Sequence, residues 1–160
     1  MTRWKALWRS SSEQVVLSIL ILILLPSTAY SKPNVVIFLA DDLGWKDVGY
    51  HDSSVFTPNI DALAKRGVEL DRFYVNPTCS PSRASLMTGL FATTHGVNAP
   101  IQWYTENGLP LEYKILPEFL KDAGYSTHLV GKWHLGHFTQ AYLPNQRGFD
   151  SFYGFLGGAI

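Results

Sequence analysis

The residues best suited to chemistry stand in one short segment, Cys79-Ser80-Pro81-Ser82-Arg83. Pro81 suits the first turn of a helix, so we expect Cys79 at or just before the helix N-terminus, where free backbone N–H groups favour an anion. Arg83 follows one helical turn later, so its guanidinium can return to the same face. The segment therefore indicates a reactive side chain beside an anion site. A buried structural cysteine in a capped helix is the alternative.

Further polar pairs follow two predicted strands. Asp41 and Asp42 come directly after residues 35–40, an apolar run typical of a strand buried on both faces of a parallel sheet. Lys132 and His134 stand two apart just after a predicted strand at 125–130. Because open α/β folds keep their sites at the carboxyl edge of the sheet, both pairs are candidates for function. For the acidic pair, a solvated strand end is the alternative.

The remaining elements complete an α/β pattern. Capping residues and apolar periodicity predict three helices and one more strand: helices at 57–67, 81–89 and 115–123, and a strand at 68–75. The order strand, helix, strand, helix, helix, strand predicts an α/β fold with a mainly parallel sheet and flanking helices. Beyond Gly131 the sequence is rich in turn residues, and we expect no further element there. Three strands make a thin core, so the pattern is typical of the front of a larger domain.

The first 31 residues have the pattern of a secretory signal peptide. Basic side chains precede an eleven-residue apolar run at 15–25, and the small residues Ala29 and Ser31 follow it. Eleven residues span roughly 17 Å of a bilayer core about 30 Å thick, so a membrane anchor is the weaker alternative. We expect cleavage after residue 31, entry into the secretory pathway, and no membrane association of the mature chain from Lys32.

Composition narrows the classes of function. The chain has 160 residues, 46% of them apolar, with thirteen basic and thirteen acidic side chains, so it has room for one globular domain. No cluster of Lys and Arg follows any predicted element, which argues against nucleic-acid binding. Cys79 is the only cysteine. A disulfide framework within the chain is therefore excluded, although the chain is predicted to be exported.

Three motifs together resemble the type I, formylglycine-dependent sulfatases. Residues 77–89 look like the family signature C-x-P-x-R followed by a helix and T-G, and residues 124–134 (GYSTHLVGKWH) look like its second signature. Asp41-Asp42-Leu-Gly44 is similar to the family's N-terminal metal motif. The resemblance runs from Asn34 to the end of the chain. It implies an alkaline-phosphatase-like sulfatase fold, with residues 32–160 as the N-terminal part of an incomplete, truncated catalytic domain.

The resemblance also implies the chemistry. Cys79 is expected to be converted to Cα-formylglycine by the formylglycine-generating enzyme, and the hydrated aldehyde attacks the sulfur of a sulfate ester. Arg83 would stabilise the formylglycine, and Lys132 would hold its hydroxyl or the sulfate. His134 is the candidate base for the elimination that releases sulfate.

A Ca²⁺ ion is the implied metal, held by Asp41, Asp42 and the modified Cys79, with further ligands that the family supplies downstream of residue 160. Closer details, such as LPNQRGFDSFYGFLGG at 143–158, resemble the arylsulfatase B group, which acts on N-acetylgalactosamine 4-sulfate. The expected substrate is thus a sulfated carbohydrate or an aryl sulfate, and the expected location is lysosomal or extracellular.

The hydrolase function has two alternatives. In the first, the chain is a truncated, non-catalytic form that acts only as a binding or interaction module and not as part of a sulfuric ester hydrolase. A phosphoesterase of the same superfold with a hydroxyl nucleophile is disfavoured, because residue 79 is Cys.

Overall fold

The computed structural model describes residues 31–159. The predicted signal peptide, apart from Ser31, lies outside these described residues. The chain divides into two units, one that ends at Leu39 and one that runs from Ala40 to the end. No helix within residues 31–159 is both long enough and apolar enough to span a bilayer.

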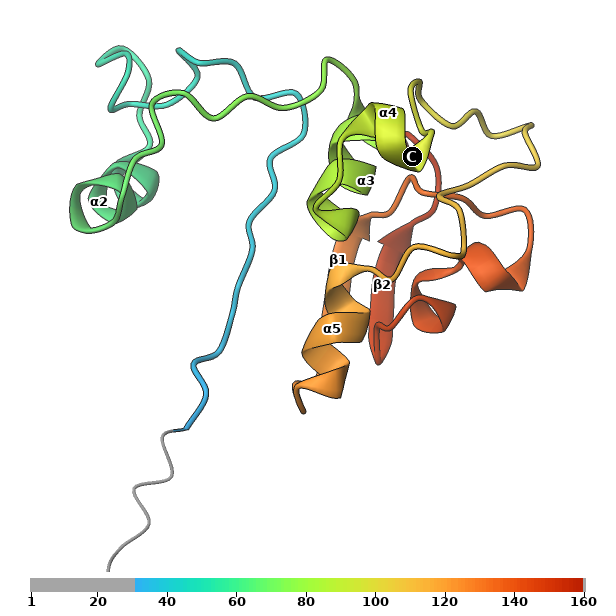
Figure 1. Cartoon of the computed structure of the whole chain (residues 1–160). Helices are drawn as coiled ribbons and strands as arrows, with labels where there is room; N and C mark the ends of the chain where they lie inside the picture. The colour runs from blue at the N-terminus through green and yellow to red at the C-terminus, as the bar shows by residue number, and fades with distance from the viewer. Residues whose placement is uncertain (1–30, 160) are drawn as a thin grey trace, which may run out of the picture. The chain divides into compact units, whose positions relative to one another are not determined.

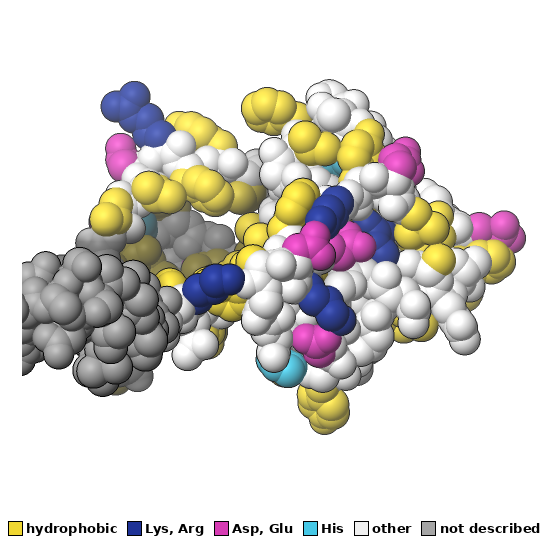
Figure 2. Space-filling view, turned by 60° about the horizontal axis from the view of Figure 1, so that its bottom comes forward, with side chains coloured by type: hydrophobic (Ala, Val, Ile, Leu, Met, Phe, Trp, Pro, Cys, Tyr) yellow, Lys and Arg dark blue, Asp and Glu magenta, His cyan; other side chains and the backbone are white. Residues whose placement is uncertain are grey.

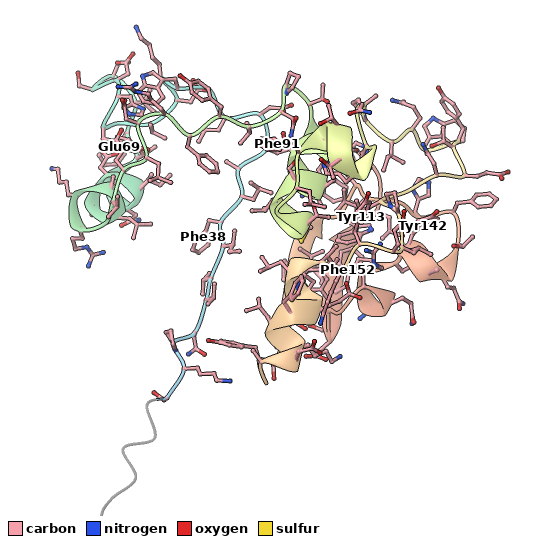
Figure 3. All side chains as sticks on the ribbon, viewed as in Figure 1. Phe38, Glu69, Phe91, Tyr113, Tyr142 and Phe152 are labelled. Atoms are coloured by element: carbon pink, nitrogen blue, oxygen red, sulfur yellow. The ribbon has the colours of Figure 1, made fainter. Side chains whose placement is uncertain are left out.

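Two predicted strands do not form. Residues 35–40 and 68–75 have extended or turn conformations without the ladder hydrogen bonds of a sheet. Their apolar side chains are exposed: 89% of Phe38 (Figure 3), 87% of Val68 and 86% of Tyr74 are accessible to solvent. A strand exists only through a partner, and no strand among the described residues pairs with either segment. The prediction of strands there was therefore wrong for this chain.

Helix α2 (Pro58–Arg66) forms where local signals predict it. Pro58 occupies the first turn, and the Gly67 N–H donates to the Leu63 carbonyl at 2.9 Å and so closes the last turn. The Thr57 hydroxyl does not cap the helix, since it donates to Asp61 and accepts from the Gly49 N–H. No residue of α2 is buried.

Helix α3 (Cys79–Thr88) carries the sulfatase-like signature. It begins two residues earlier than the sequence predicts, so Cys79 is the first residue of the helix. It ends at Gly89, whose φ of 71° is in the left-handed region that favours glycine. The short helix α4 (Ala92–His95) follows, and it was not predicted. Both helices therefore end at a glycine, since α4 ends in the same way at Gly96, with φ 77°.

Helix α5 (Leu116–Asp122) confirms the helix predicted at 115–123. The Glu118 carboxylate accepts the Ile115 backbone N–H at 2.7 Å, which satisfies one of the free donors at the N-terminus. Helix α3 contacts both α4 and α5, so the three helices form one layer beside the sheet (Figure 1).

The sheet consists of two parallel strands, β1 (His128–Lys132) and β2 (Ser151–Phe155). Their register pairs His128 with Ser151 and Lys132 with Phe155. The 3₁₀ turns η1 (Gln140–Tyr142) and η2 (Pro144–Gln146) lie in the connection between the strands. The parallel pair with flanking helices is consistent with a truncated alkaline-phosphatase-like fold, as predicted. The prediction of no element beyond Gly131 was wrong, because β2 lies there.

The core lies between the sheet and the helix layer. Trp133, 1% exposed, is its largest member, and its ring meets Phe149 edge to face with centroids 6.1 Å apart. Its indole N–H donates to the carbonyls of Gly136 and Tyr142, each at 3.0 Å. The other buried apolar residues of this cluster come from helix, loop and strand-end positions: Ala84, Val97, Ile101, Leu109, Ile115 and Leu135. Trp133 therefore anchors the backbone that follows β1 and leads to His134.

Candidate active site

The structure brings together three of the residues predicted for the site. The Lys132 Nζ atom, at the end of β1, donates to both carboxylate oxygens of Asp41, at 3.0 and 3.2 Å. The Arg83 Nη1 atom donates to the Lys132 carbonyl at 2.7 Å, and its Nη2 atom lies 3.6 Å from Asp41 Oδ1. A helix, a strand end and the segment after residue 40 thus meet in one cluster, which we call the Asp41 cluster.

The Asp41 cluster carries one excess positive charge. The side chains of Arg83 and Lys132 are only 11% and 8% exposed, whereas that of Asp41 is 46% exposed. The hydrogen bond from Lys132 is the main cause that lowers the pKa of Asp41. Burial opposes it, and the charges of Lys132 and Arg83 lower the pKa further. Asp41 is therefore ionised and orients two largely buried cations. Two cations beside one carboxylate suit the binding of a further anion.

The wider surface does not share this character. On the face drawn in Figure 2, basic and acidic side chains lie next to one another. Two ion pairs on α5 follow the same mixed pattern, Lys114 with Asp122 and Lys121 with Asp150. An anion site in this protein therefore depends on the local cluster, because the general surface charge is mixed.

Cys79 lies one helical turn before Arg83, as expected, and is a partly buried free thiol. Asp42 does not share the surroundings of Asp41, although the two were predicted to belong to one site. Its φ of 57° is in the left-handed region, its side chain is exposed, and it forms no hydrogen bond or ion pair with any residue in the described range. The two adjacent carboxylates are thus not equivalent, since only Asp41 contacts the predicted catalytic side chains.

His134 is buried and held by one hydrogen bond. It is 4% exposed, has a left-handed φ of 57°, and its Nε2 atom donates to the Ile101 carbonyl at 2.8 Å. Burial is the main cause that lowers the pKa of the imidazole, and the charges of Lys132 and Arg83 lower it further. The neutral ring then has its lone pair on Nδ1. That atom is buried and has no partner among the described residues.

The described residues do not by themselves form a Ca²⁺ site. Within residues 31–159, no group of three or more His, Cys, Asp and Glu side chains gathers where a metal could bind. Both oxygens of Asp41 accept from Lys132, and Ca²⁺ requires six to eight oxygen ligands. The metal set of Asp41, Asp42 and Cys79 therefore stays a prediction, and no chemical step below depends on it.

Sequence reasoning missed the polar groups that support α3. Asn76 Nδ2 donates to Ser85 Oγ at 3.0 Å, and the same oxygen lies 3.1 Å from Nε2 of His95, which is 1% exposed. Ser82 Oγ donates to the Asn76 carbonyl at 2.8 Å. These bonds fix the loop that leads into Cys79. In the sequence, the signal that could have indicated these hydrogen bonds was the presence of serines on a helix that packs on the core.

Ser80 is the second group that was missed. It is fully buried, and its hydroxyl accepts the Ile101 backbone N–H at 3.0 Å. Its position directly after Cys79 was visible in the sequence, but its partner was not. Ile101 thus contacts both the start of α3 and, through its carbonyl, His134.

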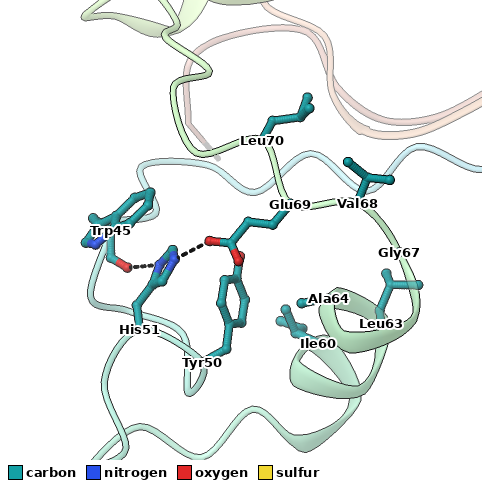
Figure 4. Close-up of a pocket in the computed structure, with 10 residues that line it drawn as sticks. All are labelled: Trp45, Tyr50, His51, Ile60, Leu63, Ala64, Gly67, Val68, Glu69 and Leu70. Carbon is teal, nitrogen blue, oxygen red and sulfur yellow. Dashed lines mark hydrogen bonds and ion pairs between the residues drawn. The ribbon is translucent and has the colours of Figure 1, made fainter.

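A separate pocket lies between α2 and the segment before it (Figure 4). His51 Nδ1 donates to the Trp45 carbonyl at 2.8 Å, and its Nε2 lies 2.7 Å from the Glu69 carboxylate. The Trp45 ring stacks on the imidazole with centroids 3.6 Å apart. These polar groups satisfy one another, and no predicted site residue lines the pocket. These contacts of His51 connect the segment before α2 with the segment after it.

The family follows from comparison with known proteins. Residues 33–159 match the family model named Sulfatase. The chain belongs to the sulfatase family. Arylsulfatase J of Mus musculus is 48% identical over 130 residues, a match that covers 81% of this chain and 22% of that protein. N-acetylgalactosamine-6-sulfatase of Homo sapiens is 45% identical over 138 residues, which covers 80% of this chain and 26% of that protein.

Solved sulfatase structures share the fold. The crystal structure of Ps i-CgsB superposes with a TM-score of 0.76 at 45% identity and covers 79% of this chain and 29% of that one. PsFucS1 sulfatase from Pseudoalteromonas sp. gives a TM-score of 0.70 at 37% identity over 94% of this chain and 30% of that one. The chain thus spans less than a third of the length of these relatives. Their names confirm the family, and they leave the predicted preference for a 4-sulfate unconfirmed.

Proposed function

We propose that the protein is part of a sulfuric ester hydrolase that acts through Cα-formylglycine made from Cys79. The Asp41 cluster is the observation that carries this proposal. It holds two largely buried cations, Arg83 and Lys132, and Arg83 lies one helical turn from Cys79. A sulfate ester is an anion, so its approach to residue 79 requires positive charge at that place. Membership of the sulfatase family supports the same reaction.

Each residue has a defined task in this proposal. Once formed, the formylglycine supplies a hydrated aldehyde that attacks sulfur and later releases the sulfate. Lys132 and Arg83 bind the sulfate oxygens, and Asp41 holds Lys132 in place through two hydrogen bonds. His134 accepts a proton at Nδ1, the ring atom that has a free lone pair.

The substrate proposed is a sulfated carbohydrate, with N-acetylgalactosamine 4-sulfate as the first candidate. The name of the human relative, N-acetylgalactosamine-6-sulfatase, favours the 6-sulfate of the same sugar as the second candidate. A related structure was solved with the carbohydrate k-i-k-neocarrahexaose, which supports a sugar rather than a simple aryl sulfate. Aryl sulfates remain suitable as assay substrates.

Maturation and location complete the proposal. Modification of Cys79 requires the formylglycine-generating enzyme, so the chain must enter the secretory pathway before it reaches a lysosomal or extracellular site. Ca²⁺ is the metal proposed for Asp41, Asp42 and residue 79. It requires additional oxygen ligands beyond those that the described residues offer.

The test measures sulfate release from the 4-sulfate and the 6-sulfate of N-acetylgalactosamine. The chain is secreted from eukaryotic cells by itself, and also as a chimera in which it replaces the matching segment of arylsulfatase J. We expect the chimera to turn over one of the two esters. Cys79→Ser is expected to retain a single covalent sulfate, because a serine attacks sulfur but has no second hydroxyl to expel it, and Cys79→Ala is expected to retain none.

The alternative, a non-catalytic binding module, gives a different pattern. An active chimera and an inactive chain would show that the chain contributes to catalysis only within a longer domain, whereas a binding module would retain the sulfate ester and release no sulfate in either form. The proposed hydrolase would be contradicted if neither the chain nor the chimera releases sulfate although Cys79 is converted in both. Their Cys79→Ser variants would then also trap no sulfate.

A further inference from the structure

One backbone residue connects the start of the signature helix to the candidate base. The Ile101 N–H donates to Ser80 Oγ at 3.0 Å, and the Ile101 carbonyl accepts from His134 Nε2 at 2.8 Å. All three residues are buried, with exposed fractions of 0% for Ser80, 5% for Ile101 and 4% for His134. Water does not compete for these bonds, so the link has a fixed geometry.

The link determines which nitrogen of His134 is available. A carbonyl oxygen can only accept, so the hydrogen of the neutral ring lies on Nε2 and the lone pair on Nδ1. Nδ1 is buried and has no partner among the described residues. A buried acceptor without a donor is costly, which indicates that its donor belongs to a group that binds there.

Gly158 lies close to the imidazole at its Cε1–Nε2 edge. A Cβ atom at position 158 would lie 2.8 Å from Cε1 and 3.1 Å from Nε2 of His134. The ring thus lies close to the backbone of Gly158 while its Nε2 is held by the Ile101 carbonyl. A turn of the ring by 180° would put Cε1 in the place of Nε2 and lose that hydrogen bond.

We propose that Ser80 is a positioning residue, which acts through the backbone N–H and carbonyl of Ile101 to hold His134 with Nε2 protonated and Nδ1 free to take a proton from the reacting group. The proposal deepens the proposed function and rests on it. Ser80 directly follows Cys79, so the same helix start carries the reactive residue and sets the orientation of the base. This gives one of the two variable positions in C-x-P-x-R a defined task.

The test observes the ring nitrogens of His134 by NMR in the secreted chain labelled with ¹⁵N-histidine, at neutral pH. In the unsubstituted chain, we expect one tautomer, with the Nε2 signal of a protonated nitrogen and the Nδ1 signal of an unprotonated one. Ser80→Ala leaves the Ile101 N–H without its acceptor, and we expect a mixture of both tautomers. Ser80→Thr keeps the hydroxyl and is expected to restore the single tautomer.

Ser82→Ala is the matched control. Ser82 lies on the same helix, but its hydroxyl donates to the Asn76 carbonyl and takes no part in the hydrogen bonds of Ile101. The loss of this hydroxyl is therefore expected to leave the tautomer of His134 unchanged. An unchanged tautomer in Ser80→Ala, or an equal change in Ser82→Ala, would overturn the proposal. If Ser80→Ala does not fold, Gly158→Ala places a methyl group against the ring and displaces it from the Ile101 carbonyl, and an unaltered tautomer there would also contradict the link.

The activity readout separates this proposal from the proposed function. In the active chimera, we expect Ser80→Ala to lower kcat by about 10-fold to 100-fold with little change in KM, as for a displaced catalytic group. The mass of the peptide with residue 79 is measured in the same samples. An unmodified Cys79 throughout would count against the proposed hydrolase, whereas the tautomer result judges the Ser80 link in either case.

Discussion

Arg83 offers the sharpest test of how the site is held together. The substitution Arg83→Met keeps the length of the side chain and removes its charge and its donors. It deletes the 2.7 Å hydrogen bond to the Lys132 carbonyl, which is partly buried and charge-assisted and contributes about 1.5–3 kcal/mol. It also deletes the 3.6 Å contact with the half-exposed Asp41, worth about 0.2–1 kcal/mol. We therefore expect a loss of about 2–4 kcal/mol in the free energy of unfolding.

Arg72 supplies the matched control. Its guanidinium lies 3.7 Å from Asp71, but the two side chains are 85% and 80% exposed, so Arg72→Met is expected to cost less than about 1 kcal/mol. Urea unfolding followed by tryptophan fluorescence measures both variants, with buried Trp133 as a reporter. With a slope of about 2 kcal/mol/M, the midpoint should fall by about 1–2 M for Arg83→Met and hardly at all for Arg72→Met. Equal shifts would refute the assignment of Arg83 as a buried support of the site.

Two further predictions concern the sheet and its edge. Gly154→Ala places a Cβ against the Gly131 carbonyl across the strand pair, and we expect a loss of about 1–3 kcal/mol by the same urea assay. The control Gly157→Ala meets its nearest atom at 3.8 Å and is expected to stay within about 0.5 kcal/mol, so equal effects would contradict the close approach. The hydrogen bond from Lys121 lowers the pKa of Asp150 from 3.8 to about 2, so its stabilising effect is complete above pH 3.8 and is lost as the pH falls towards 2. Asp150→Asn should therefore flatten the acid limb of stability in that range, and an unchanged limb in pH-dependent unfolding would exclude this contribution.

The helices were predictable because their signals are local. Pro58 begins α2 with the fixed φ of proline, and Gly89 ends α3 in the left-handed conformation that glycine favours. Strands depend on partners far away in the sequence. Residues 35–40 have the composition of a buried strand but no ladder among the described residues, whereas β2 forms in spite of Gly154 because β1 is beside it.

The same contrast holds for the candidate site. Residue type and spacing pointed to Cys79, Arg83 and a carboxylate at position 41, and the resemblance to the sulfatase signatures added Lys132 and His134. The contacts that position them were not readable. Ile101 acts through its backbone N–H and carbonyl, so its side chain gives no sign of its role in the sequence.

The central claim is that residue 79 is read as a sulfatase nucleophile, and the mass of one peptide tests it most directly. Trypsin releases residues 73–83 from the secreted chain, and this peptide contains the only cysteine. Conversion of the Cys79 thiol to the aldehyde lowers its mass by about 18 Da. The account predicts the lighter peptide. In Arg83→Met, which removes the Arg of C-x-P-x-R and the trypsin site after it, the fragment with residue 79 runs from 73 to 114, and the account predicts no loss of about 18 Da from it. A full-mass thiol in the unsubstituted chain, under conditions in which a full-length sulfatase is modified, would contradict the claim.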